Sequence, residues 1–252
     1  GLLLSELSKF AWPAVLGPLM AGEDIGESAA HAAMTEIMDG RADPAQIAAF
    51  IVALRSKGET VDEMLGLVRA MYDAAVTGDV GVPVVDTAGT GGDRAGTFNI
   101  STTAAFIAAG AGAHVAKHGN RAASSRSGSA DLLEALGVRI DLAPESVATL
   151  IREAGFGFFF APRFHPAMRH AGPVRTALGV PTVFNFLGPL ANPARARAQS
   201  VGVSDPRMAP RLAKMKGGVI TRDTVSNEPT FTYPELDGGH VAYSVLGRAA
   251  RP

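Results

Sequence analysis

The sequence contains no cysteine in 252 residues, and this absence excludes several kinds of chemistry at once. Without thiols the chain forms no disulfide, no thiolate metal site and no cysteine nucleophile. The absence also fits a reducing compartment, so we expect a cytoplasmic protein.

The sequence also has little net charge and no long apolar run. Its formal net charge of -1 provides no long-range field that would gather a polyanion. No uninterrupted apolar stretch reaches the roughly 18 to 20 residues that span a membrane. We therefore expect no nucleic acid and no membrane as partners, and a phosphate-bearing ligand would have to be bound by a local site.

The composition that is present indicates a globular protein that begins with helices. Hydrophobic residues make up 47% of the chain and charged residues 19%, which is enough apolar material for a substantial core. Residues 1–77 are rich in Ala, Leu, Met and Glu. Asp43 before Pro44 is typical of an N-cap and first helical position, and Thr60 with Glu63 fits a capping box. We expect a small helical subdomain here.

From residue 82 onward, short apolar strands alternate with helical stretches. Strand-like runs occupy residues 82–86, 114–117, 155–161 and 200–204, and helical stretches occupy 129–137 and 145–155. This alternation predicts a mainly parallel sheet covered by helices. Prolines and glycines break the segment 166–193 into short helices and turns, which we place outside the sheet. The end of the chain, from about residue 214, is typical of short strands and turns.

The strongest local motif is a glycine loop between a predicted strand and a predicted helix. It reads DTAGTGGD at residues 86–93 and is followed by TFNIST at 97–102. Gly89, Gly91 and Gly92 allow the backbone to approach a ligand, and the loop N–H groups with the helix N-terminus suit a pyrophosphate. Without further context, the alternative is a tightly packed turn in which Asn99 or Ser101 is an ordinary N-cap.

A second polar motif follows the next predicted strand, and it reads KHGNRAASSRSGSAD at residues 117–131. So many donors in one loop favour an anionic or polyhydroxylated ligand, because buried polar groups need partners. The alternative is a solvent-exposed loop whose histidine forms its hydrogen bonds within the protein. The donor side chains of this motif are Lys117, His118, Asn120, Arg121, Ser124, Ser125 and Ser129.

Taken together, GTGGD, NIST and KHGNRAASSRSGSAD resemble the signatures with which anthranilate phosphoribosyltransferases bind phosphoribosyl pyrophosphate (PRPP). Residues 166–193 are similar to the segment on the anthranilate side of that family's site. The resemblance extends to about Asp205, roughly four fifths of the chain. Pyrimidine nucleoside phosphorylases belong to the same superfamily and use a related lysine-and-serine loop.

The resemblance implies a two-domain α/β fold with the active site in the cleft between the domains. The small all-helical domain would comprise residues 1–77 and 166–193, and the larger α/β domain, with a mainly parallel sheet, residues 78–165 and 194–252. The implied activity is transfer of the phosphoribosyl group from PRPP to the amine of anthranilate, a step of tryptophan biosynthesis. Mg²⁺ is the implied cofactor, and a homodimer formed through the helical domain is the implied assembly.

The resemblance also assigns roles to individual residues. Catalytic roles would fall to Lys117 and His118, and Ser101 would help to hold Mg²⁺. The planar guanidinium group of an arginine can form two parallel hydrogen bonds with a carboxylate, which agrees with Arg175 as an anthranilate contact. Without the family match, Arg175 would be interpreted as a surface arginine on a helix. The implied PRPP contacts are Gly89, Gly92, Asp93, Thr97, Asn99, Ser101, Thr102, Lys117, Ser125 and Ser129. The implied anthranilate contacts are Gly89, His118, Asn120, Arg175 and Pro189, with Gly188 close by.

One feature of the family is missing, which keeps rival functions open. Family members carry an adjacent Asp-Glu pair that binds Mg²⁺, and no such pair occurs after residue 205. Either residues are absent from the sequence or the deletion is real. A nucleoside phosphorylase is disfavoured because KHGNR and the Arg175 segment follow the anthranilate pattern. A non-catalytic relative that binds nucleic acid or another partner is favoured by the missing pair. The nearly neutral charge and the intact acceptor segment oppose it.

Overall fold

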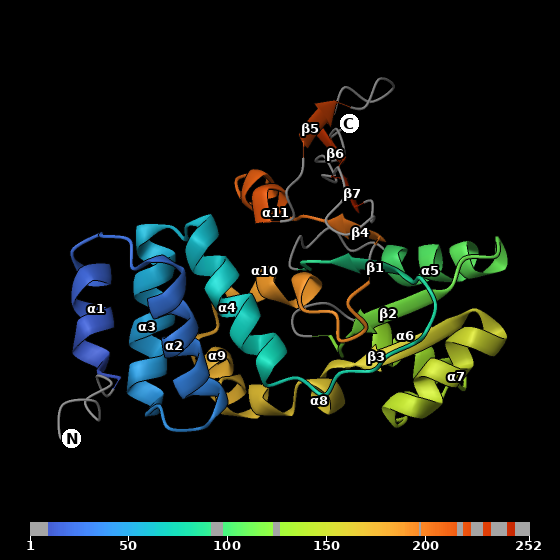
Figure 1. Cartoon of the computed structure of the whole chain (residues 1–252), viewed down its shortest axis with the longest axis horizontal. Coiled ribbons are helices and arrows are strands. Elements are labelled where there is room, and N and C mark those ends of the chain that lie inside the picture. Colours follow the sequence, from blue (N-terminus) through green and yellow to red (C-terminus); the bar gives the residue numbers. More distant parts are fainter. Residues whose placement is uncertain are drawn as a thin grey trace, which may run out of the picture. The chain divides into compact units, whose positions relative to one another are not determined.

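The structure is a computed structural model that describes residues 10–91, 98–122, 127–196 and 198–215, with the backbone of 219–222, 229–232 and 241–244 (Figure 1). The chain divides into two compact units. The first unit is Gly1–Ala74 with Ala167–Val183, and the second is Ala75–Pro166 with Phe184–Pro252. Within the part of the chain that is described, no helix is long and apolar enough to cross a membrane.

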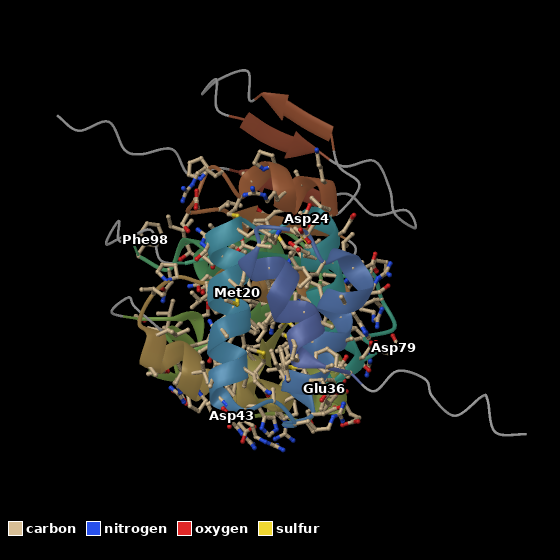
Figure 2. All side chains as sticks on the ribbon, turned by 90° about the vertical axis from the view of Figure 1, so that its left-hand side faces the viewer. Met20, Asp24, Glu36, Asp43, Asp79 and Phe98 are labelled. Atoms are coloured by element: carbon tan, nitrogen blue, oxygen red, sulfur yellow. The ribbon has the colours of Figure 1, made fainter. Side chains whose placement is uncertain are left out.

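The first unit is built from helices. In Figure 1, α2 lies beside α4 and α1 beside α3, and the contacts between these pairs agree. Met20 at the end of α1 is 80% exposed (Figure 2). The helices of this unit are α1 (Trp12–Met20), α2 (Gly26–Met38), α3 (Pro44–Lys57), α4 (Val61–Asp73) and α9 (Gly172–Leu178), preceded by the 3-10 helix η1 (Pro166–His170).

Both helix starts expected from the sequence are confirmed. The Asp43 side chain accepts from the Ala45 N–H at 2.8 Å, and Pro44 is the first residue of α3. The Thr60 hydroxyl accepts from the Glu63 N–H at 3.2 Å, while the Glu63 carboxylate accepts from the Thr60 N–H at 2.8 Å. Such reciprocal bonds satisfy the N–H groups that a helix start leaves without partners.

A glycine allows α2 and α4 to pack closely. A Cβ at Gly66 would lie 2.2 Å from the Glu27 carbonyl oxygen and 2.8 Å from the His31 nitrogen, so any side chain there would push the helices apart. The unit has its own buried apolar core, in which Met34 of α2 and Phe50 of α3 are 0% exposed. The helical pattern of the sequence therefore produces a separate core.

The second unit contains a mainly parallel sheet, as the sequence predicts. In the described residues its strand order is β3-β2-β1-β4-β7-β6-β5. The pairs β3-β2, β2-β1, β1-β4 and β4-β7 are parallel, and β7-β6 and β6-β5 are antiparallel. The strands are β1 (Val85–Gly89), β2 (Val115–Gly119), β3 (Phe156–Phe160), β4 (Ala198–Gly202), β5 (Val219–Arg222), β6 (Pro229–Thr232) and β7 (Val241–Ser244).

Helices cover both faces of this sheet. Successive side chains of a strand point to opposite faces, so Phe158 and Phe159 of β3 lie on opposite faces of the sheet. Phe159 packs in a cluster with Ile151 of α7, whereas Phe158 packs with Leu133 of α6. The helices of the second unit are α5 (Ile100–Gly110), α6 (Ser129–Ala135), α7 (Pro144–Ala154), α8 (Ala161–Phe164), α10 (Phe184–Leu187) and α11 (Ala209–Met215), with the 3-10 helix η2 (Gly188–Leu190).

Residues 184–193 differ from the expected domain division. The resemblance implies that they belong to the helical domain, but Phe184–Pro252 groups with the second unit. The reason lies in hydrogen bonds that only the folded chain reveals. The Asn192 side chain donates to the Ala116 carbonyl at 2.8 Å, and the Gly188 carbonyl lies 3.2 Å from the His118 ring. These bonds tie the segment to strand β2.

Candidate functional site

Both motifs lie at the carboxyl ends of neighbouring parallel strands. Strand β1 ends at Gly89, β2 ends at Gly119 and β4 ends at Gly202. The strand order reverses at β1, because β2 lies on one side of it and β4 on the other. In open α/β sheets such a reversal leaves a crevice beyond the carboxyl ends of the strands, where ligands commonly bind. The topology therefore brings the glycine loop and the lysine motif together at the carboxyl ends of the parallel strands.

The start of the glycine loop is fixed to strand β4. The Thr90 N–H donates to the Gly202 carbonyl at 2.9 Å, and the Thr90 hydroxyl lies 2.9 Å from the Ser204 hydroxyl. Gly91 then adopts φ 64°, the left-handed conformation that favours glycine. A Cβ at Gly89 would meet no atom closer than 3.7 Å. Gly92, Asp93 and Thr97, which the resemblance places in the PRPP site, lie outside the described residues.

Asn99 stands at the N-cap position of α5, but its side chain makes no capping hydrogen bond. Its amide nitrogen donates instead to the Gly128 carbonyl and the Ser127 hydroxyl, each at 3.2 Å. The alternative interpretation of Asn99 as an ordinary N-cap is therefore wrong. The amide ties the helix start to the serine-rich part of the second motif.

Ser101, Thr102 and Ser129 join the same two motifs at the helix start. The Lys117 ammonium donates to the Ser101 hydroxyl at 3.3 Å, and the Thr102 hydroxyl donates to the Ser129 hydroxyl at 3.1 Å. The Thr87 hydroxyl of β1 donates to the Ser101 carbonyl at 2.7 Å. Three segments that are separate in sequence thus contribute polar groups to one cluster, which suits a polyanionic ligand.

Lys117 is the buried cation of this cluster, with 1% of its surface exposed. Its ammonium also donates to the Thr87 carbonyl at 2.6 Å. Burial lowers the pKa of Lys117 to about 8, although the charge of Asp86 partly opposes that shift. An ammonium has three N–H groups, so the bonds to Thr87 and Ser101 leave one for another acceptor.

His118 is held as a neutral ring. Its Nδ1 lies 3.2 Å from the Gly188 carbonyl oxygen, and a carbonyl only accepts, so Nδ1 carries the proton. Burial, and then the neighbouring ring of His165 with its centroid 5.2 Å away, lower the pKa of His118 to about 3. Its buried Nε2 has no hydrogen-bond partner among the described residues. His118 is therefore a hydrogen-bond acceptor and a weak base.

The remaining predicted contacts are spread over both units. Asn120 is exposed, and its side-chain oxygen accepts from the Arg121 N–H at 2.7 Å. Pro189 is buried in η2 of the second unit. Arg175 lies on α9 of the first unit, and burial lowers its pKa. Ser125 lies outside the described residues.

Asp86 and Gln199 are two buried polar residues that the sequence reasoning missed. They face each other across β1 and β4, and the Gln199 amide donates to an Asp86 carboxylate oxygen at 2.9 Å. The other oxygen of Asp86 accepts from the His118 N–H at 3.2 Å. Burial raises the pKa of Asp86, and Lys117 and the hydrogen bonds partly counter that effect. A carboxylate that ends an apolar run at 82–86 was the available signal.

The described residues do not fit a magnesium site. They contain no group of three or more His, Asp or Glu side chains that could hold a metal ion. Ser101 is the predicted ligand, and its hydroxyl already accepts from the Lys117 ammonium. Mg²⁺ prefers carboxylate oxygens and is repelled by a neighbouring cation, so Ser101 alone makes a poor anchor.

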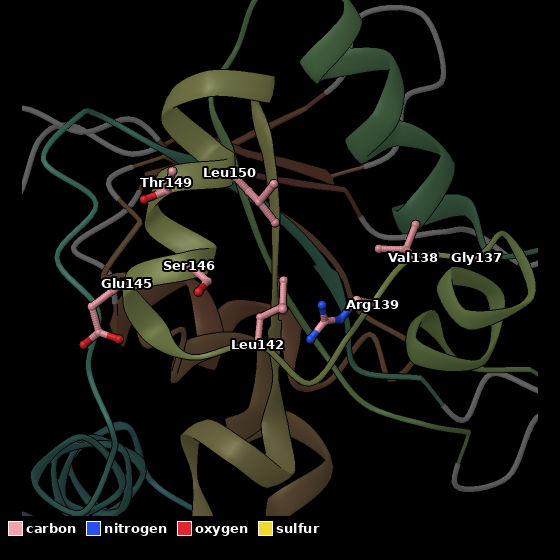
Figure 3. Close-up of a pocket in the computed structure, with 8 residues that line it drawn as sticks. All are labelled: Gly137, Val138, Arg139, Leu142, Glu145, Ser146, Thr149 and Leu150. Carbon is pink, nitrogen blue, oxygen red and sulfur yellow. The ribbon is translucent and has the colours of Figure 1, made fainter.

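An open depression of about 700 Å³ lies elsewhere in the second unit and contains none of the motif residues. Figure 3 shows its lining, which comes from α7 and from residues 137–142 before it. Leu142 and Leu150 contribute apolar walls and Arg139 a charged group. The depression is therefore a useful location for control substitutions.

Comparison with known proteins assigns both units to one family. The pattern described as "Glycosyl transferase family, a/b domain" matches residues 81–225. The pattern described as "Glycosyl transferase family, helical bundle domain" matches residues 13–75. The helical and α/β parts of the chain thus correspond to the two parts of known glycosyl transferases.

Named relatives identify a more specific family within the glycosyl transferases. An anthranilate phosphoribosyltransferase from Salinispora arenicola is 58% identical over 206 residues, which are 80% of this chain and 58% of the relative. The chain thus spans less than two thirds of that relative's length. The crystal structure of the enzyme of that name from Thermus thermophilus is 44% identical, with a TM-score of 0.79, and the match covers 92% of this chain and 73% of that one.

A more distant solved structure shares the same fold. It is the anthranilate phosphoribosyltransferase from Saccharomyces cerevisiae in complex with PRPP and Mg, 27% identical with a TM-score of 0.77. The match covers 87% of this chain and 69% of the yeast protein. On these matches and the motif geometry, the chain belongs to the anthranilate phosphoribosyltransferase family.

Proposed function

We propose that this protein transfers the phosphoribosyl group of PRPP to the amine of anthranilate, giving N-(5-phosphoribosyl)anthranilate and pyrophosphate. The observation that carries the proposal is the buried Lys117 ammonium against Ser101 at the start of α5. A buried cation beside a helix N-terminus and a glycine loop is a suitable environment for a pyrophosphate. The PRPP complex of the yeast relative supports the same ligand.

The reaction requires positioning and charge stabilisation more than a strong base. When pyrophosphate leaves C1 of the ribose, negative charge develops on the leaving group and positive charge on the sugar. Lys117 and the N–H groups at the start of α5 would stabilise the leaving group. The amine of anthranilate is a neutral nucleophile. His118 has a pKa of about 3, so it would accept a hydrogen bond from the amine rather than remove a proton in the ground state.

From the family resemblance we propose Gly89, His118, Asn120, Pro189 and Arg175 as contacts of the acceptor. Arg175 would form a paired hydrogen bond with the anthranilate carboxylate, because a guanidinium presents a planar fork of donors. His118 and Pro189 are already near each other in the second unit, through the contact of the His118 ring with the neighbouring Gly188 carbonyl. The roles of these residues are part of the proposal.

We propose Mg²⁺ as the cofactor from the family resemblance. The yeast relative was solved with PRPP and Mg, and Mg²⁺ would neutralise charge on the pyrophosphate when bound. The described residues supply only Ser101 toward it, so we assign no step of the reaction to the metal. A homodimer through the helical domain and a cytoplasmic location are likewise proposed from the resemblance.

Isothermal titration of the chain with PRPP, with anthranilate and with single-stranded DNA tests the proposed function. We expect binding of PRPP and anthranilate, formation of phosphoribosylanthranilate when both are present, and no binding of DNA. Lys117→Gln should abolish the PRPP signal, and Arg139→Ala, in the depression away from the motifs, should leave it unchanged. DNA binding without PRPP binding would favour the non-catalytic relative and refute the proposal.

A further inference from the structure

Three side chains from different parts of the second unit point donors at one short turn, residues 188–191. The His118 Nδ1 lies 3.2 Å from the Gly188 carbonyl oxygen. The Gln199 amide donates to the Pro189 carbonyl, and the His165 Nε2 lies 2.7 Å from the Ala191 carbonyl oxygen. Each of these carbonyls can only accept, so His118 of β2 and Gln199 of β4 hold the 188–191 turn against the sheet, and His165 holds it at the end of α8.

The amide nitrogen of Gln199 is bound on both sides. One N–H donates to the Pro189 carbonyl and the other to Asp86, at 2.9 Å. Asp86 is fixed in turn by the His118 backbone N–H at 3.2 Å. Asp86 is 1% exposed and Gln199 5%, so water does not compete for these bonds.

This chain of bonds connects the 188–191 turn to the strands that carry the motifs. Asp86 belongs to β1, which leads into the glycine loop, and Gln199 is its partner in the parallel register of β4. His118 belongs to β2 and also contacts the turn directly. A shift of Gln199 would therefore move the Pro189 carbonyl relative to His118, although Gln199 lies inside the sheet.

We propose that Gln199 is a positioning residue for the acceptor substrate, an aromatic amine with a carboxylate. It holds the Pro189 carbonyl in register with His118 by using Asp86 as its fixed anchor. The inference rests on the proposed function, because that proposal places His118 and Pro189 on the acceptor side. Gln199 itself would not touch either substrate. Its loss should weaken anthranilate binding and spare PRPP binding.

Two variants separate positioning from stability. Gln199→Met keeps a side chain of similar length and removes both donors. In the paired variant Asp86→Asn/Gln199→Glu, the carboxylate and the amide exchange places. The bond between positions 86 and 199 is restored, and the new amide oxygen at position 86 still accepts from the His118 N–H. A carboxylate at position 199 cannot donate, however, so the Pro189 carbonyl keeps no donor from this site.

The experiment measures urea unfolding together with calorimetric titrations of anthranilate and PRPP for the wild-type chain and both variants. For Gln199→Met we expect lower stability, a Kd for anthranilate raised roughly three- to tenfold, as for one lost hydrogen bond, and a Kd for PRPP changed less than about twofold. For the paired variant we expect stability to recover in part, because the bond between positions 86 and 199 returns while the Pro189 carbonyl still lacks its donor. The Kd for anthranilate should stay raised.

Two results overturn the inference. If anthranilate affinity recovers with stability in the paired variant, Gln199 has a structural role only. If Gln199→Met binds anthranilate as the wild type does, the Pro189 contact has no effect on the acceptor. If Gln199→Met does not fold, the paired variant alone decides. A wild-type chain that binds no anthranilate refutes the proposed function itself, which distinguishes that failure from the others.

Discussion

Replacing Lys117 by Met should reveal the free energy that the protein loses by burying an ammonium group. Burial lowers the pKa of Lys117 from 10.5 to about 8. At 1.36 kcal/mol per pKa unit, this difference corresponds to roughly 3 kcal/mol that the charged form costs the folded state at pH 7. Met fills a similar volume without charge, so Lys117→Met removes this cost.

The contribution of Lys117 to the free energy of unfolding depends on pH with a definite sign. Between about pH 8 and 10.5 the unfolded chain still binds the proton of Lys117, whereas the folded protein has released it. Wild-type stability therefore gains from this residue as pH rises through that window. The advantage of Lys117→Met over wild type should shrink by about 2 to 3 kcal/mol between pH 7 and 10. This change comes on top of what the variant loses in hydrogen bonds to Thr87 and Ser101 and in the attraction between Lys117 and Asp86.

Lys57→Met provides a control, because the pKa of Lys57 is shifted in the opposite direction to that of Lys117. Lys57 donates to Asp24 at 2.6 Å and to the buried Glu63 at 3.0 Å. These bonds outweigh the effect of burial and raise the pKa of Lys57. Its contribution to stability is complete below pH 10.5 and is lost as pH rises through the folded value. Removal should cost roughly 3 kcal/mol at pH 7, as expected for breaking a buried ion pair.

Urea unfolding at pH 7, 8, 9 and 10 measures both effects. The difference between wild type and Lys117→Met should change steeply above pH 8, and the difference for Lys57→Met should stay nearly constant to pH 10. Parallel curves for wild type and Lys117→Met across this range would refute the reasoning, because the ammonium would then titrate alike in both states. PRPP titration of the same variant should show lost binding.

Three further predictions test the acceptor side, the helical core and the metal. Arg175→Ala should weaken anthranilate use by about 1.5 to 3 kcal/mol and leave PRPP binding intact, with Arg139→Ala as control, and an unchanged KM and kcat for anthranilate at saturating PRPP would contradict it. Gly66→Ala should lower the free energy of unfolding by at least about 2 kcal/mol because its Cβ would lie close to a backbone oxygen, whereas Gly110→Ala, with open space at the end of α5, should not lower it. A magnesium titration of turnover should saturate only at about millimolar concentration if Ser101 is the main protein ligand, and saturation at about micromolar concentration would show that residues outside the described ranges complete the site.

The sequence by itself determined the features that depend on neighbours along the chain. Helix starts at Asp43 and Thr60 follow from side chains that reach backbone groups two or three residues away. The glycine loop before α5 and the alternation of strands and helices are also local signals, and they predicted a mainly parallel sheet. The motifs alone are specific enough to indicate the family.

Only the tertiary structure decided the contacts between distant segments. Asp86 and Gln199 are 113 residues apart, and nothing local to either residue states that β1 and β4 are neighbours in register. The same holds for residues 184–193, whose prolines and glycines predicted turns but not the unit they join. A local pattern fixes backbone conformation, whereas the partner of a buried polar group is fixed by which strands the whole sheet brings together. The neutral state of His118 and the low pKa of Lys117 depend on such partners and on burial, and therefore on the fold.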